Sequence, residues 1–175
     1  MRPERSSLDP IARLIDDHRN FVRTVESFQQ EARSSLRAPA PSVRFVAQVA
    51  RFAEFLKRDV DRVHGQKEER GLFPVLGRYI PADGGPVGVM LNEHETLRHL
   101  QRTLDSEAQR LEKDPLAPES IRSVSATADA VEGLLGVHID KEDTVLFPMA
   151  YQVLSPRDLQ EIAQVFDEID SADLR

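Results

Sequence analysis

Two stretches of the 175-residue sequence place a histidine four residues before a glutamate, His64 before Glu68 and His138 before Glu142. Because successive residues of an α-helix are turned by about 100°, side chains four residues apart point in nearly the same direction and can reach one point. Imidazole nitrogens and carboxylate oxygens are ligands for iron, manganese and zinc. Each pair therefore predicts part of a metal site.

Two further predicted helices each carry a single histidine, His18 or His94, on their apolar stripe. A lone histidine on such a stripe is more often a hydrogen-bonded core residue, and a single histidine–glutamate pair is often exposed with its glutamate in solvent. Four histidines and two glutamates on four inward-facing stripes do not fit those readings, because a buried ionised carboxylate is costly unless it is paired or binds a metal. The pattern predicts a metal site inside the helical core, and its ligands are His18, His64, Glu68, His94, His138 and Glu142.

The donor set narrows the choice of metal. Nitrogen and oxygen donors without sulfur suit iron or manganese best, and zinc is a further candidate. Two ions that share both glutamates and an oxide or hydroxide bridge would each keep about one open position. The donor set therefore predicts two ions, iron or manganese, bridged by oxide or hydroxide, with dioxygen or a related small molecule as the ligand.

An internal repeat contains these residues. The segment HGQKEERGLFP at 64–74 matches HIDKEDTVLFP at 138–148, and His18 and His94 are each preceded by an acid. The repeat predicts two copies of a helix pair that pack into one pseudo-symmetric unit.

Four long segments with helical periodicity carry the candidate ligands. The first runs over about 9–37, with Asp9 as N-cap and Pro10 in the first turn, and ends at the proline-rich stretch 38–41. The second begins at Ser42 and is expected to end near Pro74, because proline cannot continue the hydrogen-bond ladder. A turn at 81–85 precedes the third, breaks at 114–118 precede the fourth, and the fourth is expected to end near Pro148.

Short connections favour antiparallel neighbours. The predicted fold is all-α, an up-down-up-down antiparallel four-helix bundle with a short C-terminal fifth helix that starts at Ser155–Pro156. Residues 1–175 are expected to form a single domain.

Composition excludes several functions. The formal net charge of −7 argues against a nucleic-acid grip, and the absence of cysteine excludes disulfides, thiolate metal sites and cysteine nucleophiles. The N-terminus lacks the apolar core of a secretory signal, and no stretch reaches the roughly 20 apolar residues that span a bilayer. We therefore expect a cytoplasmic protein with no nucleic-acid partner and no membrane contact; the sequence does not indicate its oligomeric state.

With these residues in view, the sequence resembles the hemerythrin-like HHE cation-binding family from His18 to Pro148. The paired HxxxE(E/D)…LFP signature carries the resemblance, together with Asp17–His18 and Glu93–His94. The resemblance implies a four-helix bundle with a non-haem di-iron centre in which Glu68 and Glu142 bridge the two ions.

One departure from the family bears on function. Dioxygen-carrying members have a second histidine four residues after the third-helix one, and here that position is Arg98. His99 is turned about 140° from His94 and is expected to be solvated. The departure favours redox chemistry on peroxide, dioxygen or nitric oxide, which makes the chain a candidate di-iron oxidoreductase in oxidative or nitrosative stress. The alternatives are a module that reversibly binds or senses dioxygen or iron, and a bundle whose metal is only structural.

Four neighbouring residues each allow two interpretations. Glu69 and Asp143, which follow the ligand glutamates, could hold ligand imidazoles or be solvated, and we favour solvation. Tyr79 and Tyr151 could add a phenolate ligand, but packing at a helix end is the preferred interpretation.

Overall fold

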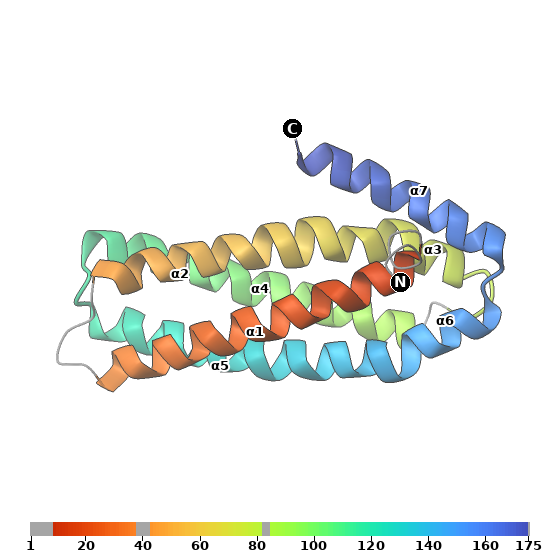
Figure 1. Cartoon of the computed structure of the whole chain (residues 1–175). Coiled ribbons are helices and arrows are strands. Elements are labelled where there is room, and N and C mark those ends of the chain that lie inside the picture. Colours follow the sequence, from red (N-terminus) through yellow and green to blue (C-terminus); the bar gives the residue numbers. More distant parts are fainter. Residues whose placement is uncertain (1–8, 38–42, 82–84, 175) are drawn as a thin grey trace, which may run out of the picture.

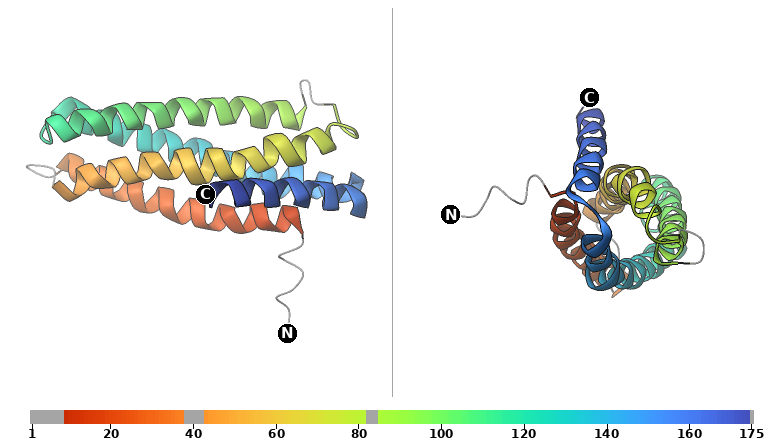
Figure 2. Two further views of the ribbon diagram at one scale, coloured as in Figure 1. Left: turned by 90° about the horizontal axis from the view of Figure 1, so that it is seen from above. Right: turned by 90° about the vertical axis from the view of Figure 1, so that its right-hand side faces the viewer.

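The computed structural model describes residues 9–37, 43–81 and 85–174, and this part of the chain is helical without a strand. Figure 1 shows long helices lying side by side. They are α1 (Pro10–Arg37), the segment that starts with α2 (Val43–Phe55), α4 (Pro86–Lys113) and the segment that starts with α5 (Pro118–Lys141). Helices α1 and α4 each pack against both α2 and α5, which closes the ring seen end-on in Figure 2. The fold is therefore all-α, as predicted.

The helix starts that the structure describes follow the capping signals. The Asp9 carboxylate accepts hydrogen bonds from the backbone N–H groups of Ile11 and Ala12 at 3.0 and 3.3 Å. At Ser155 the side chain and Asp158 form a reciprocal capping box that starts α7 (Pro156–Asp173). Helix α7 has 18 residues and is longer than the short helix predicted. The predicted cap Ser42, the break at 38–41 and part of the turn at 81–85 lie outside the described residues.

The second segment ends at Leu76, near Pro74 as predicted, whereas the fourth runs on to Val153, and in neither does the proline stop the helix as expected. The second continues through two π-helical stretches, η1 (Leu56–Gly65) and η2 (Glu68–Leu72), into α3 (Phe73–Leu76). The fourth continues through η3 (Glu142–Leu146) into α6 (Phe147–Val153). Pro74 and Pro148 lie in the first turn of the α-helical piece that follows each π-turn, where proline is tolerated.

The apolar interior consists of two clusters, one on each side of the candidate ligands. The upper core, next to α7, consists of Ile11, Leu14, Leu72, Phe73, Val75, Leu76, Val87, Met90, Leu146, Phe147, Ala150, Leu154, Ile162 and Phe166. The lower core fills the rest of the bundle and consists of Phe21, Val25, Phe28, Ala32, Phe45, Val49, Phe52, Ala53, Leu56, Val60, Leu97, Leu104, Ala108, Leu111, Ile121, Val124, Ala128, Val131, Leu135 and Ile139. Five of the six candidate ligands lie in the sequence at the change from one core to the other, and His138 lies one residue before the last lower-core residue of its segment, Ile139. The predicted ligands therefore form a polar layer between two apolar ones.

Helix α7 lies outside the ring of four and packs on α1, η1 and η2 (Figure 2). Its Phe166 is fully buried against Gly71, where an added Cβ would lie 2.8 Å from the phenyl ring. Ion pairs surround this contact, with Arg13 and Lys67 both bound to Asp170 at 2.5 and 2.8 Å. None of the described helices combines the length and the apolar character needed to cross a membrane.

Candidate metal centre

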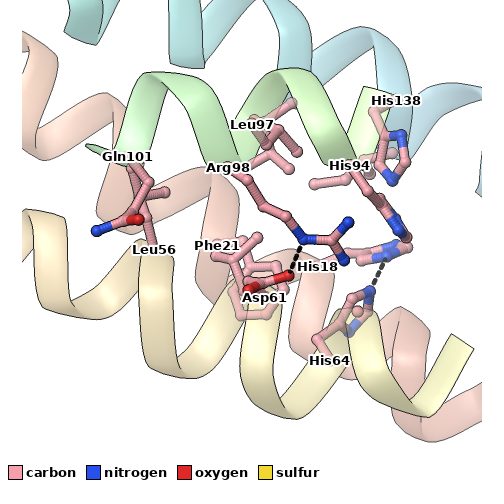
Figure 3. A pocket seen from close by; sticks show the side chains of 14 residues that line it. His18, Phe21, Leu56, Asp61, His64, His94, Leu97, Arg98, Gln101 and His138 are labelled. Carbon is pink, nitrogen blue, oxygen red and sulfur yellow. Dashed lines mark hydrogen bonds and ion pairs between the residues drawn. The ribbon is translucent and has the colours of Figure 1, made fainter. Parts of the chain in front are cut away.

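The four predicted histidines meet inside the bundle, one from each long segment. Their exposed fractions are 6 % or less. The rings form two pairs, His18 with His64 and His94 with His138, and the ring centroids of each pair lie 4.9 Å apart. The Nε2 atoms of His18 and His64 are 3.2 Å apart (Figure 3). The structure thus brings together all four histidines that the spacing singled out.

The two predicted glutamates complete the cluster. Glu68 and Glu142 are fully buried. Glu142 places its two oxygens 3.2 Å from Nε2 of His18 and 3.3 Å from Nε2 of His138. One oxygen of Glu68 lies 3.3 Å from Nε2 of His94 and 3.7 Å from Nε2 of His64. Each carboxylate therefore reaches one histidine of each pair.

None of the four carboxylate oxygens of Glu68 and Glu142 has a hydrogen-bond partner of acceptable geometry among the described residues. A buried carboxylate without donors is costly, so the arrangement calls for a cation. The potential ligand atoms form two groups, each with all its atoms within 4.8 Å of one another. One group contains Glu68, His94, His138 and Glu142, and the other contains His18, His64 and Glu142. Because Glu142 belongs to both, the geometry fits two neighbouring metal ions.

Each histidine also has a carboxylate on its outer nitrogen. Nδ1 of His18 lies 2.9 Å from Asp143, and Nδ1 of His94 lies 2.7 Å from Glu69. The preference for solvated Glu69 and Asp143 was therefore wrong, because each reaches a histidine on a neighbouring helix.

The other two histidines are held in the same way. Nδ1 of His64 lies 3.2 Å from Asp17, and Nδ1 of His138 lies 2.9 Å from Glu93. No role was predicted for these two acids, although each directly precedes a candidate ligand histidine. An acid next to a ligand at corresponding places of both repeat halves was the signal that could have identified them.

These outer contacts fix the tautomer of the imidazoles. An ionised carboxylate can only accept, so each Nδ1 donates its hydrogen and leaves the Nε2 lone pair free to face the centre. Carboxylate–histidine pairs of this kind orient metal-bound imidazoles and raise their basicity. The donor geometry and the unpartnered carboxylates together indicate a metal-binding site.

Comparison with known families agrees with this geometry. The family model described as Hemerythrin HHE cation binding domain matches residues 9–150. The chain belongs to the hemerythrin HHE family. A comparison with curated proteins found no match. The family match ends before α7, so the helix that packs on η2 lies outside the matched segment.

The two LFP turns of this hemerythrin domain position the rings. Phe147 stacks on His18 with centroids 5.6 Å apart, and Phe73 stacks on His94 with centroids 5.9 Å apart. Both phenylalanines directly follow the π-turns that begin at Glu68 and Glu142. A π-turn bonds residue i to i+5 and often occurs at functional sites. The repeated motif therefore supplies a ligand carboxylate, an outer carboxylate and a stacking ring from one short stretch.

The surroundings of the hemerythrin site raise the pKa of three of its histidines, His18, His94 and His138. Burial alone would lower the pKa of His94, but the adjacent carboxylates of Glu68 and Glu69 overcome it and raise the pKa to about 10. Burial and Glu142 act in the same opposed way on His18 and His138, and the net pKa of each is raised. The pKa of Glu142 is held low, because the adjacent imidazoles of His138 and His18 outweigh its burial. The cluster therefore attracts positive charge, which either protons or metal ions can supply.

The remaining candidates lie away from the ligand atoms. Tyr79 is 48 % and Tyr151 46 % exposed, and their hydroxyl groups donate to Asp158 and Asp9 at 2.8 Å each. Both tyrosines pack at helix ends, as preferred. His99 is exposed, as expected from its angle to His94.

A cavity of about 30 Å³ adjoins the four histidines (Figure 3). Its other lining is mostly apolar, and Arg98 and Asp61 lie at its edge between α4 and η1. A water needs at least about 10–15 Å³ measured in this way, so the cavity holds about two waters or a molecule of that size.

Proposed function

We propose that this chain is a non-haem di-iron protein that binds dioxygen or reacts with peroxide or nitric oxide. The six ligands are His18, His64, Glu68, His94, His138 and Glu142, and the two glutamates bridge the ions. The single observation that carries the proposal is the convergence of four oriented Nε2 atoms on two buried carboxylates that have no hydrogen-bond donor.

The choice of iron rests on the donors. The chain has no cysteine, and the inner cluster contains only imidazole nitrogen and carboxylate oxygen. This set suits iron better than softer metals, and manganese or zinc would be the competing occupants. Bound iron supplies one-electron redox chemistry together with a position for an external ligand.

The residues of the chain supply the rest. The four outer carboxylates hold the imidazoles in place. The two apolar cores exclude water on either side of the site. The cavity limits the reacting ligand to a few atoms. These features support dioxygen, peroxide or nitric oxide as ligand and leave no room for an organic substrate.

One observation favours the alternative, a module that binds dioxygen reversibly without turnover. Among the described residues, Asp61 is the single carboxylate in the cavity lining, and it is ion-paired with Arg98 at 2.7 Å. A carrier needs no proton relay, whereas peroxide reduction consumes protons. Stopped-flow mixing of the ferrous protein with dioxygen separates the two functions: a persistent, reversible band supports the carrier, and rapid conversion to the ferric state supports the enzyme.

We infer further that the long helices follow one another up-down-up-down within a single domain. The order of core residues along the chain supports this topology. The first and third segments pass from the upper core through His18 or His94 to the lower core, and the second and fourth pass in the opposite order through His64 or His138.

Metal analysis of protein purified without chelators tests the proposal. We expect about two irons per chain, as the two ligand groups require, and ferric charge-transfer bands in the near ultraviolet. A chain that takes up no iron on reconstitution, or binds a single zinc, would overturn the di-iron assignment.

A further inference from the structure

The lining of the cavity beside the histidines is partly exposed at one ion pair. Fourteen residues line it. All but two of them are buried, and the two exceptions are Arg98 and Asp61, whose side chains are 24 % and 36 % exposed. Figure 3 shows this pair spanning the space between α4 and η1 in front of the histidines. The ion pair therefore separates the cavity from solvent.

Arg98 also contacts the shell around the ligands. Its Nε donates to Asp61 at 2.7 Å, and its Nη2 donates to Glu69 at 2.5 Å. The same oxygen of Glu69 accepts from Nδ1 of His94. One guanidinium thus bridges the carboxylates of Asp61 and Glu69. Its Nη1 also lies 3.6 Å from the carboxylate of Glu95, three residues earlier in the same helix.

This pair breaks the pseudo-symmetry of the site. Arg98 is four residues after His94, and the corresponding position after His18 is Val22. Asp61 is three residues before His64, and the corresponding position before His138 is Leu135. The ion pair is therefore not required by the ligand set, which the other half builds with apolar residues at the same places. A role other than metal ligation explains the Arg98–Asp61 ion pair better.

We propose that the Arg98–Asp61 ion pair is the entrance to the cavity and that Arg98 determines which charge class of small ligand enters. The inference rests on the proposed function, since it concerns ligands of the iron site. A ligand enters when the guanidinium swings toward solvent. While Arg98 is present, its charge offsets one of the two negative charges of Asp61 and Glu69, so a small anion is repelled less than it would be without the guanidinium.

Two substitutions separate closure from charge. Arg98→Met removes both the ion pair that closes the cavity and the positive charge of the guanidinium. Asp61→Asn weakens the same ion pair but keeps the positive charge of Arg98. We expect Arg98→Met to speed nitric oxide binding to the ferrous protein about tenfold and to slow azide binding to the ferric protein about tenfold, because unpaired carboxylates repel the anion. Asp61→Asn should speed the binding of both probes.

Matched variants control for unspecific effects. Arg102→Met removes an exposed arginine one turn further along α4 that pairs with Glu95 and does not line the cavity, and both rates should stay unchanged. Arg98→Lys restores the charge and should recover most of the azide rate. Equal changes for both probes in Arg98→Met, or none in either, would overturn the role of Arg98.

A second readout does not need iron. By ¹⁵N NMR, the Nε–H of Arg98 should exchange with water more slowly than that of Arg102, because it donates to Asp61 across the cavity mouth. Equally fast exchange would overturn the closure. If the wild-type chain takes up no iron, the proposed function fails, and this exchange measurement still tests whether the Arg98–Asp61 bond on which closure depends is formed.

Discussion

The carboxylate of Glu93 lies 2.9 Å from Nδ1 of His138 and also binds Lys141, which precedes Glu142 in the sequence. Glu93 directly precedes the ligand histidine of its own helix, so one residue connects two candidate ligands on different helices. Asp17 occupies the same place in the other half and contacts His64 at 3.2 Å. The internal repeat therefore extends beyond the ligands to the groups that orient them.

Substituting one of these acids should weaken metal binding without unfolding the chain. Glu93→Ala removes the acceptor for Nδ1 of His138, and loss of such a partner typically costs about 10–100-fold in metal affinity. The measurement is a competition titration with a chelator. Glu112→Ala, an exposed glutamate near the other end of α4, is the matched control. Equal affinity of the two variants would contradict the orienting role.

Glu142 is the ligand common to both groups of donor atoms. We predict that Glu142→Ala abolishes the two-metal stoichiometry and keeps the helical circular dichroism, because two apolar cores remain to hold the bundle. Iron analysis of the purified variant measures this. Glu132→Ala, at an exposed position of α5, should keep two irons. Retention of two tightly bound irons in Glu142→Ala would rule out the bridging assignment.

The pH dependence of the metal-free chain should follow its histidines. The pKa of His94 is raised from 6.5 to about 10, so protonation of His94 stabilises the fold fully below pH 6.5, and this stabilisation is lost as the pH rises through about 10. Metal ions compete with these protons, so metal affinity should rise over the same range. Thermal unfolding of the metal-free protein and metal titrations at several pH values measure the two effects.

The variant His94→Gln provides the control for this titration. It removes the shifted group, so its stability should depend less on pH between 6.5 and about 10 than that of the wild type. A wild-type midpoint that does not fall over this range would contradict the raised pKa.

Gly71 is expected to be essential for the packing of α7 against the bundle. A Cβ at this position would lie 2.8 Å from the Phe166 ring, so Gly71→Ala should destabilise the chain by about 1–3 kcal/mol through overpacking. Gly133→Ala is the matched control, because nothing lies within 4 Å of its added Cβ and it should stabilise α5 by about 0.5–1 kcal/mol. Thermal or urea unfolding measures both. A stabilising Gly71→Ala would show that α7 does not pack there.

The long helices were predictable because each buries one face, which places apolar residues at helical spacing along the sequence. His18 and His94 lie at that spacing. The continuation past Pro74 was not predictable, because it depends on π-turns whose extra residue per turn leaves no periodic signal in so short a stretch. The angle of Glu69 was judged from ideal α-helix geometry, which does not describe η2. Its contact with His94 on another helix depends on how the helices pack, which no local pattern specifies.

The small volume beside the histidines has a consequence for selectivity among oxidants. Hydrogen peroxide consists of two heavy atoms and fits a space of about 30 Å³, whereas an alkyl hydroperoxide also carries a hydrocarbon chain that would have to displace buried side chains such as Phe21 and Leu97. If the proposed reaction with peroxide takes place, the packing of the apolar wall would therefore admit the inorganic peroxide and exclude the organic one by size.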